Sequence, residues 1–158
     1  FGGIGFEPRY NLAPTQFAPV IREREGVRDV SMLRWGLLPS WAKDEALANR
    51  LFNARSETAA EKPSFRSAMK ARRCLIPADG FYEWAKTEHG KQPYFIHLAT
   101  DEPMAMAGLW EHWRTPGGEA LETFTILTTE ANDRIRALHE RMPVILPAET
   151  WGLWISQN

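Results

Sequence analysis

Short runs in which apolar and polar residues alternate dominate the chain. In residues 121–128, Phe124 and Ile126 alternate with threonines, and residues 92–99 repeat the same period. A period of two predicts strands with one buried face. From this pattern, or from short apolar runs between turn residues, we expect strands at 20–21, 30–33, 74–77, 81–85, 92–99, 104–113, 121–128 and 144–146. Residues 88–91 form a turn sequence, which predicts that the strands on either side of it make a hairpin.

Helices are fewer and shorter. Start signals and apolar spacing predict them over residues 43–51, 63–72, 130–139 and 148–155. Thr129 is the expected N-cap of the third helix, and Pro147 precedes the fourth where proline is favoured. Many short strands with few helices predict a single α+β domain over residues 1–158, with a largely antiparallel, barrel-like sheet and a few flanking helices.

Composition excludes several classes of protein. The 158 residues suit one domain, 44% are apolar and 25% are charged, as in ordinary globular proteins. No apolar run approaches the roughly 20 residues of a membrane span, and no signal peptide is visible. The one cysteine, Cys74, permits no internal disulfide, which favours an intracellular, reducing location. The four histidines are scattered, so we predict no metal site and no cofactor.

Charge gives a weak indication of nucleic-acid binding. The net charge is −1, yet 14 of the 19 basic residues are arginine, the side chain best suited to phosphate and base contacts. Arg66, Lys70, Arg72 and Arg73 form a local cluster. Charge alone favours a solvated helix face for this cluster.

Glu83 is the most unusual residue of the sequence, because it lies inside the aromatic run 81–84. The apolar residues before it and the Asp79-Gly80 turn make this run resemble a buried strand. A buried carboxylate is costly to ionise, so its pKa would rise toward the range useful for proton transfer. A half-buried strand whose glutamate faces solvent explains the pattern equally well.

Two further segments carry polar groups suited to chemistry. Asn53 and Arg55 are two apart on an extended segment and so point to the same side, where they could grip a phosphate or sugar oxygen. A turn with a helix cap at Ser56 or Thr58 is the simpler alternative. His139 follows the predicted third helix, where the helix dipole favours the charged ring; an ordinary helix end is again the alternative.

Five motifs occur in a fixed order along the chain. They are Tyr10-Asn11-Leu12-Ala13-Pro14-Thr15, Arg34-Trp35-Gly36-Leu37-Leu38-Pro39-Ser40-Trp41, Asn53-Ala54-Arg55-Ser56-Glu57-Thr58, Cys74-Leu75-Ile76-Pro77-Ala78-Asp79-Gly80-Phe81-Tyr82-Glu83-Trp84 and His139-Glu140-Arg141-Met142-Pro143. In this order they closely resemble the SOS-response-associated peptidase (SRAP) family. The resemblance runs from about residue 10 to residue 154.

The resemblance implies a sensor of abasic sites in single-stranded DNA. Members of this family use a cysteine exposed when the initiator methionine is removed, which the protein is thought to do itself. The amine and thiol of that cysteine condense with the abasic aldehyde to form a thiazolidine crosslink. The implied chemistry is therefore that of an autoproteolytic peptidase and an abasic-site lyase, acting as a monomer on DNA in the cytoplasm and nucleoid.

The resemblance also implies roles for individual residues. Asn53, Glu83 and His139 are the implied catalytic residues: Asn53 positions the cysteine or sugar, Glu83 shuttles protons, and His139 acts on the opened sugar or its 3′ phosphate. The implied DNA-binding residues are Asn11, Pro14, Trp41, Arg55, Trp84 and Arg141.

The start of the sequence departs from the family pattern. It reads Phe1-Gly2-Gly3-Ile4 in place of Met-Cys-Gly-Arg, and Cys74 has no α-amine to offer. We therefore expect that the natural protein carries a further N-terminal segment and that the C-terminus is also shortened. Two alternatives remain: a non-catalytic module that binds single-stranded DNA, and a Glu/His hydrolase that acts on peptides.

Overall fold

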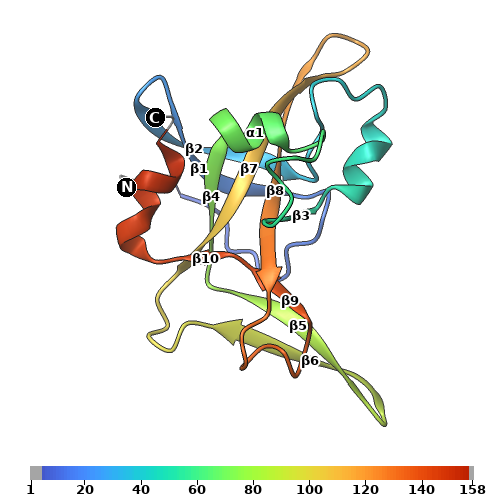
Figure 1. Cartoon of the computed structure of the whole chain (residues 1–158), viewed down its shortest axis with the longest axis vertical. Coiled ribbons are helices and arrows are strands. Elements are labelled where there is room, and N and C mark those ends of the chain that lie inside the picture. The colour runs from blue at the N-terminus through green and yellow to red at the C-terminus, as the bar shows by residue number, and fades with distance from the viewer. Residues whose placement is uncertain (1–4, 157–158) are drawn as a thin grey trace.

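The computed structural model of the protein describes residues 5–156 (Figure 1). Its strands are β1 (Phe17–Arg24), β2 (Val27–Trp35), β3 (Asn53–Arg55), β4 (Arg73–Ala78), β5 (Gly80–Thr87), β6 (Gly90–His97), β7 (Met104–Arg114), β8 (Ala120–Glu130), β9 (Arg141–Pro143) and β10 (Ile145–Leu146). Its helices are the 3-10 helices η1 (Glu45–Arg50) and η2 (Ala148–Thr150) and the α-helices α1 (Arg66–Ala71) and α2 (Trp151–Ile155). The α+β class with a barrel-like sheet is confirmed.

Five strands close into a barrel. Their order is β7-β4-β1-β2-β8, and the pairing of β8 with β7 completes the ring. Every pair in the ring is antiparallel except β2 with β8, which run parallel. The remaining short strands extend the two longest members: β3 and β9 add to β8, and β10 adds to β7. A closed ring leaves few unpaired sheet edges, so this small domain keeps most of its backbone polar groups bonded.

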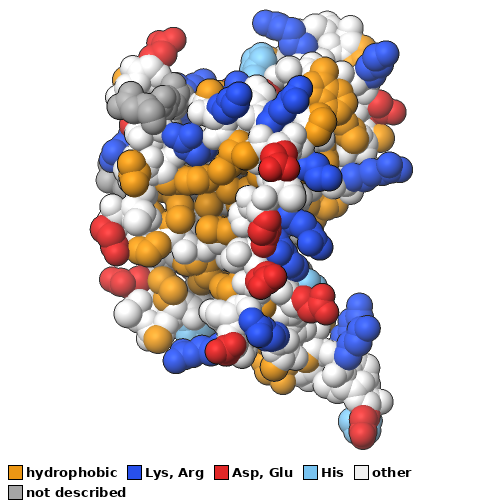
Figure 2. Space-filling view, in the orientation of Figure 1, with side chains coloured by type: hydrophobic (Ala, Val, Ile, Leu, Met, Phe, Trp, Pro, Cys, Tyr) orange, Lys and Arg blue, Asp and Glu red, His pale blue; other side chains and the backbone are white. Residues whose placement is uncertain are grey.

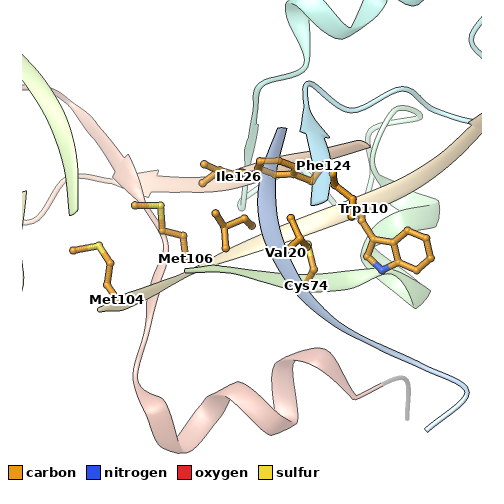
Figure 3. Close-up of a cluster of buried hydrophobic side chains, with 10 residues drawn as sticks. Val20, Cys74, Met104, Met106, Trp110, Phe124 and Ile126 are labelled. Atoms are coloured by element: carbon orange, nitrogen blue, oxygen red, sulfur yellow. The ribbon is translucent and has the colours of Figure 1, made fainter. Parts of the chain in front are cut away.

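The barrel interior is packed with apolar side chains from every strand of the ring. Figure 3 shows Val20, Cys74, Trp110 and Phe124 converging from four strands. Phe124 is fully buried and stacks on Trp35 with 6.2 Å between ring centroids. Cys74 belongs to this core, as its apolar surroundings in the sequence predict.

Strands β5 and β6 form a separate two-stranded ribbon that extends away from the barrel (Figure 1). The hairpin predicted from its turn sequence is confirmed, and Thr87 pairs with Gly90 across the turn. Of the two predictions for the strand around Glu83, the buried strand is wrong and the half-buried strand is confirmed, because no second layer among residues 5–156 covers the ribbon. Phe81 packs on the barrel core, whereas Tyr82 and Trp84 on the next positions remain 41% and 49% exposed.

The helix predicted over residues 130–139 is wrong. Strand β8 continues to Glu130, which pairs with Arg141 of β9, so Thr129 lies within a strand and caps nothing. Two single turns follow instead. The Asn132 side chain caps the first by accepting hydrogen bonds from the backbone N–H groups of Arg134 and Ile135, each at 3.1 Å. Sheet pairing at 128–130 outweighs the helical tendency of the sequence there.

No helix among residues 5–156 is long and apolar enough to cross a membrane. The face in Figure 2 has apolar side chains over its middle, while basic and acidic side chains surround them. The ribbon projects below this face and carries charged residues near its tip.

Strand β2 offers a direct test of the barrel core. Leu33 is fully buried, whereas its neighbour Met32 is 45% exposed on the opposite face. We expect Leu33→Ala to lower the free energy of unfolding by about 2–5 kcal/mol, through lost burial and the cavity left behind. Met32→Ala should change it by about 0.5 kcal/mol or less. Urea denaturation of both variants measures the difference, and equal losses would contradict the described burial of this strand.

Candidate functional site

Strand β3 presents Asn53 and Arg55 on one face of the sheet. It runs parallel to β8 with Asn53 beside Ile126 and Arg55 beside Thr128. Ala54 between them is 1% exposed, whereas both polar neighbours are exposed. The prediction that the two side chains share a side is confirmed. The turn that follows is also confirmed, but neither Ser56 nor Thr58 forms a side-chain cap within residues 5–156.

Arg141 is held firmly by two neighbours. Its guanidinium donates two parallel hydrogen bonds to the carboxylate of Glu57, at 2.8 and 2.9 Å. It also donates to the carbonyl and hydroxyl oxygens of Thr128, at 3.0 and 3.1 Å. The hydrogen bonds from Arg141 lower the pKa of Glu57 to about 2. This clamp ties the loop after β3 to β8 and β9.

Arg55 lies beside this clamp without joining it. The positive charge of Arg55 contributes to the lowered pKa of Glu57. Within the described part of the chain, the Arg55 guanidinium has no hydrogen bond or ion pair. An exposed guanidinium with no protein partner is able to bind an incoming anion.

His139 is positioned by the backbone of Arg141. The ring Nδ1 lies 3.0 Å from the Arg141 N–H, which donates to it when Nδ1 is unprotonated. The Arg141 carbonyl oxygen is 3.1 Å from the same atom and accepts from it when Nδ1 is protonated. Both ring states therefore have a partner at Nδ1. The clamp on Arg141 thus fixes a backbone segment that orients His139.

One open pocket brings Glu83 and His139 together. Its volume is about 550 Å³, and its lining residues belong to the ribbon and to the loop that joins β8 to β9. Figure 1 shows this loop beside the ribbon. Its lining residues are Glu83, Trp84, Lys86, Lys91, Ala137, Leu138 and His139. Glu83 is half-buried on its face of β5. A carboxylate and an imidazole on two walls of one pocket are suited to acid–base chemistry.

The other residues singled out in the sequence lie at different distances from this pocket. Trp84 lines it directly. Trp41 is 57% exposed and is followed by Ala42, whose carbonyl accepts a hydrogen bond from the indole N–H of Trp113. Trp113 belongs to β7 and pairs with Leu121 near the start of β8. The segment from Thr128 back to Leu121 spans roughly 23 Å at about 3.3 Å per residue. Trp41 is therefore near the opposite end of β8 from the Arg141 clamp.

Asn11 and Pro14 belong to the segment that leads into β1. Leu12 between them packs against the barrel core, and the Thr15 N–H donates to the Trp35 carbonyl at 2.9 Å. Within residues 5–156, neither residue lines the pocket that holds His139.

Cys74 is excluded as a nucleophile. Its side chain is fully buried in the barrel wall, and burial raises the pKa of the thiol. A buried, protonated thiol is unreactive. Residues 5–156 contain no cluster of histidine, cysteine and carboxylate side chains that could hold a metal ion.

Comparison with known proteins places these features in a family. Residues 3–158 match the family described as SOS response associated peptidase (SRAP). The chain belongs to the SRAP family. It is 45% identical over 152 residues to the abasic site processing protein YoqW of Bacillus subtilis, covering 96% of this chain and 68% of that protein. It is 37% identical over 175 residues to the abasic site processing protein HMCES of Gallus gallus, covering 91% of this chain and 52% of that protein.

Solved structures with the same SRAP fold are also similar. A protein from Bacteroides thetaiotaomicron has a TM-score of 0.85 at 32% identity, covering 91% of this chain and 64% of its own. A protein from Bordetella bronchiseptica has a TM-score of 0.83 at 33% identity, covering 96% of this chain and 78% of its own. The fold of this chain is therefore shared with proteins of known structure.

Sequence reasoning missed the clamp in this SRAP chain. Glu57 and Arg141 are 84 positions apart, and no local spacing links them. It also missed Lys86, Lys91 and Leu138, which line the pocket. The ribbon turn places the two lysines opposite each other, so the hairpin prediction alone could have paired them.

The pH dependence of stability tests the clamp. The pKa of Glu57 is about 2 in the folded chain, below its ordinary 4.5. The ionised pair therefore stabilises the fold above about pH 4.5, and this stabilisation disappears as the pH falls toward 2. We expect wild type to be more stable than Glu57→Gln near neutral pH, with a difference that shrinks below pH 4.5.

Urea denaturation at a series of pH values measures this difference. Glu61→Gln is the control, since Glu61 is an exposed carboxylate of the same loop with no ion pair within residues 5–156. Its difference from wild type should stay flat across the same range. A Glu57→Gln difference that is equally flat would contradict the clamp.

Proposed function

We propose that this chain processes abasic sites in single-stranded DNA. The observation that carries the proposal is the pocket with Glu83 on one wall and His139 on the other. It is supported by the similarity to relatives named abasic site processing proteins. Trp84, which lines this pocket, provides a ring for a base, and the exposed Arg55 near the Arg141 clamp provides a cation for phosphate.

The proposed chemistry is addition of an amine and a thiol to the aldehyde of a ring-opened abasic site. The α-amine of an N-terminal cysteine, which these 158 residues do not include, attacks the carbonyl carbon. Loss of one water gives a Schiff base. The neighbouring thiol then adds to the C=N carbon and its proton passes to the nitrogen, which closes a thiazolidine. No oxidant or reductant is needed.

Glu83 is the proposed proton shuttle. The attacking amine must lose a proton, and the hydroxyl of the addition product must gain one to leave as water. A single carboxylate does both in turn if it is accessible on one wall of the site. The same group would assist removal of an initiator methionine that precedes the cysteine.

His139 is the proposed partner of the opened sugar or its 3′ phosphate. Its Nδ1 is engaged with Arg141, which leaves Nε2 as the nitrogen able to meet a substrate. We propose that Arg141 acts mainly by holding this arrangement, since Glu57 and Thr128 occupy its guanidinium. Direct phosphate contact then belongs to Arg55.

The remaining proposed contacts follow the DNA strand away from the pocket. Asn53, which faces the same side as Arg55, positions the sugar or the cysteine. Trp84 stacks against a nucleotide at the pocket. Trp41, Asn11 and Pro14 contact the strand at a distance from the chemistry.

Substitution of the two pocket residues tests the catalytic assignment. With the family's Met-Cys-Gly-Arg start added before these residues, we expect Glu83→Ala and His139→Ala each to slow covalent adduct formation by about 10²–10⁴-fold, as for lost general acid–base catalysis. Denaturing gels at saturating abasic single-stranded DNA measure the rate. Glu88→Ala, at the exposed tip of the ribbon, is the matched control. Unchanged rates in both pocket variants would contradict the assignment.

Salt dependence tests the role of Arg55. A guanidinium that binds one phosphate of single-stranded DNA releases about 0.7 counterion. Arg55→Gln should therefore reduce the slope of log affinity against log salt by about 0.7. Fluorescence anisotropy with this chain and a labelled oligonucleotide measures the slope. Arg28→Gln, an exposed arginine on the β1–β2 hairpin paired with Glu23, should leave the slope unchanged, and equal slopes for all three proteins would exclude Arg55.

A non-catalytic single-strand binding module is the second candidate. The burial of Cys74 favours it for residues 5–156, since no reactive thiol is available there. Equal affinity for intact and abasic strands, with steep salt dependence in both, would support this candidate over the first.

A further inference from the structure

The outer face of the ribbon carries a continuous row of exposed rings. Trp84 lies 6.2 Å from Tyr82 between centroids, and Tyr82 lies 5.2 Å from Phe95. Phe95 lies 5.5 Å from the His97 ring and nearly parallel to it, at 18°. We call Tyr82, Trp84, Phe95 and His97 the aromatic row.

Strand register places the row on one face. Tyr82 is directly opposite Phe95, and Gly80 is directly opposite His97. Alternate positions of a strand share a face, so the residues between them, including Glu83, point to the other side. Tyr82 and Phe95 are 41% and 50% exposed, so residues 5–156 leave the face open at these two rings.

Gly80 keeps the row in place. A Cβ at this position would lie 2.7 Å from the Phe95 ring, which therefore rests directly over the glycine backbone. The Phe95 ring therefore packs against the backbone of Gly80. A row of rings fixed before binding loses little conformational entropy when a ligand stacks on it.

Two lysines continue the same face toward the tip. Lys86 and Lys91 are directly opposite each other, and neither has an ion-pair partner in the described part of the chain. Like charges directly opposite in a ribbon are destabilising. An unpaired cationic couple beside exposed rings is electrostatically complementary to an anionic ligand with flat groups. At the other end of the row, a carboxylate oxygen of Asp101 lies 2.9 Å from Nδ1 of His97. The positively charged end of this face is therefore the one with the two lysines.

We propose that the aromatic row is a stacking platform for unpaired bases next to the processed nucleotide, with Lys86 and Lys91 on the phosphates. The pocket is lined from both faces of the ribbon, by Glu83 on one face and by Trp84, Lys86 and Lys91 on the other. The platform is therefore continuous with the pocket. A DNA strand is the ligand that combines flat bases with regularly spaced negative charges. This inference rests on the proposed function, since it extends the same strand along the ribbon.

A second copy of the chain fits this face less well. Its own Lys86 and Lys91 would enter the interface, and burying unpaired cations opposes association. An uncharged apolar partner would also leave both lysines without counterions. The combination of rings and lysines therefore favours nucleic acid.

Binding of a stable abasic analogue tests the platform without any covalent step. The probe is a labelled single-stranded oligonucleotide with one tetrahydrofuran site and flanking thymidines. We expect Phe95→Ala and Tyr82→Ala each to weaken binding by about 5- to 100-fold, the loss of stacking on one ring. Met32→Ala is the control, because Met32 is 45% exposed on β2 and lies outside the ribbon. It should retain wild-type affinity.

Two additional variants separate binding from folding. Phe95→Leu keeps apolar contact over Gly80 but removes the ring, so it should remain folded by circular dichroism and still bind more weakly. Lys91→Gln relieves the repulsion with Lys86, so its thermal stability should equal or exceed wild type. Its affinity should nevertheless fall, with a salt slope reduced by about 0.7.

The outcomes distinguish the two proposals. Wild type that fails to bind the probe overturns the proposed function and the platform with it. Wild-type binding that is unchanged in the Phe95 and Tyr82 variants, or equally weakened by Met32→Ala, overturns the platform alone. Unchanged DNA affinity together with a shift from dimer to monomer in sedimentation would assign the row to a protein interface.

Discussion

The hydrogen bonding of β8 along both of its edges is the constraint on which the rest of the structure depends. This 11-residue strand pairs with β7 and then β9 on one edge, and with β2 and then β3 on the other. Its first half closes the barrel, where Phe124 packs in the core. Its second half gathers short strands from distant parts of the sequence. The pairing of β8 therefore both closes the barrel and brings together the segments that form the site.

The Arg141 clamp connects strand β8 to His139 in the pocket. Thr128 of β8 accepts hydrogen bonds from the Arg141 side chain, and the Arg141 backbone in turn contacts His139. Glu57 completes the clamp from the loop after β3. The His139 imidazole is therefore positioned by contacts to the barrel, whereas Glu83 reaches the same pocket from the projecting ribbon. A site built from two separately supported walls stays open to a long polymeric substrate such as a DNA strand.

Much of the fold was predictable from the sequence, because alternation and turn residues act locally. A period of two predicts the ribbon and the long strands. It also predicts that the side chains of Asn53 and Arg55 lie on the same face. The failures are non-local. Pairing with β9 extends β8 to Glu130, where a helix over 130–139 was expected, and within residues 5–156 no second layer covers the strand of Glu83.

The site was predictable only as a set of parts. Ordered motifs predicted the family, which is confirmed, and named the candidate residues, whose roles stay predictions. Their convergence depends on contacts between positions as distant as Glu57 and Arg141, which no spacing rule contains. The same limit applies to Trp41, whose motif is as clear as the others although it lies near the far end of β8.

Intact-mass analysis of the natural full-length protein, before and after mixing with abasic single-stranded DNA, is the most direct test of the central claim. We expect loss of an initiator methionine and a covalent adduct whose added mass equals the oligonucleotide less one water. We expect no adduct with the tetrahydrofuran analogue, which has no aldehyde. An unprocessed terminus and an unchanged protein mass after mixing would contradict the account.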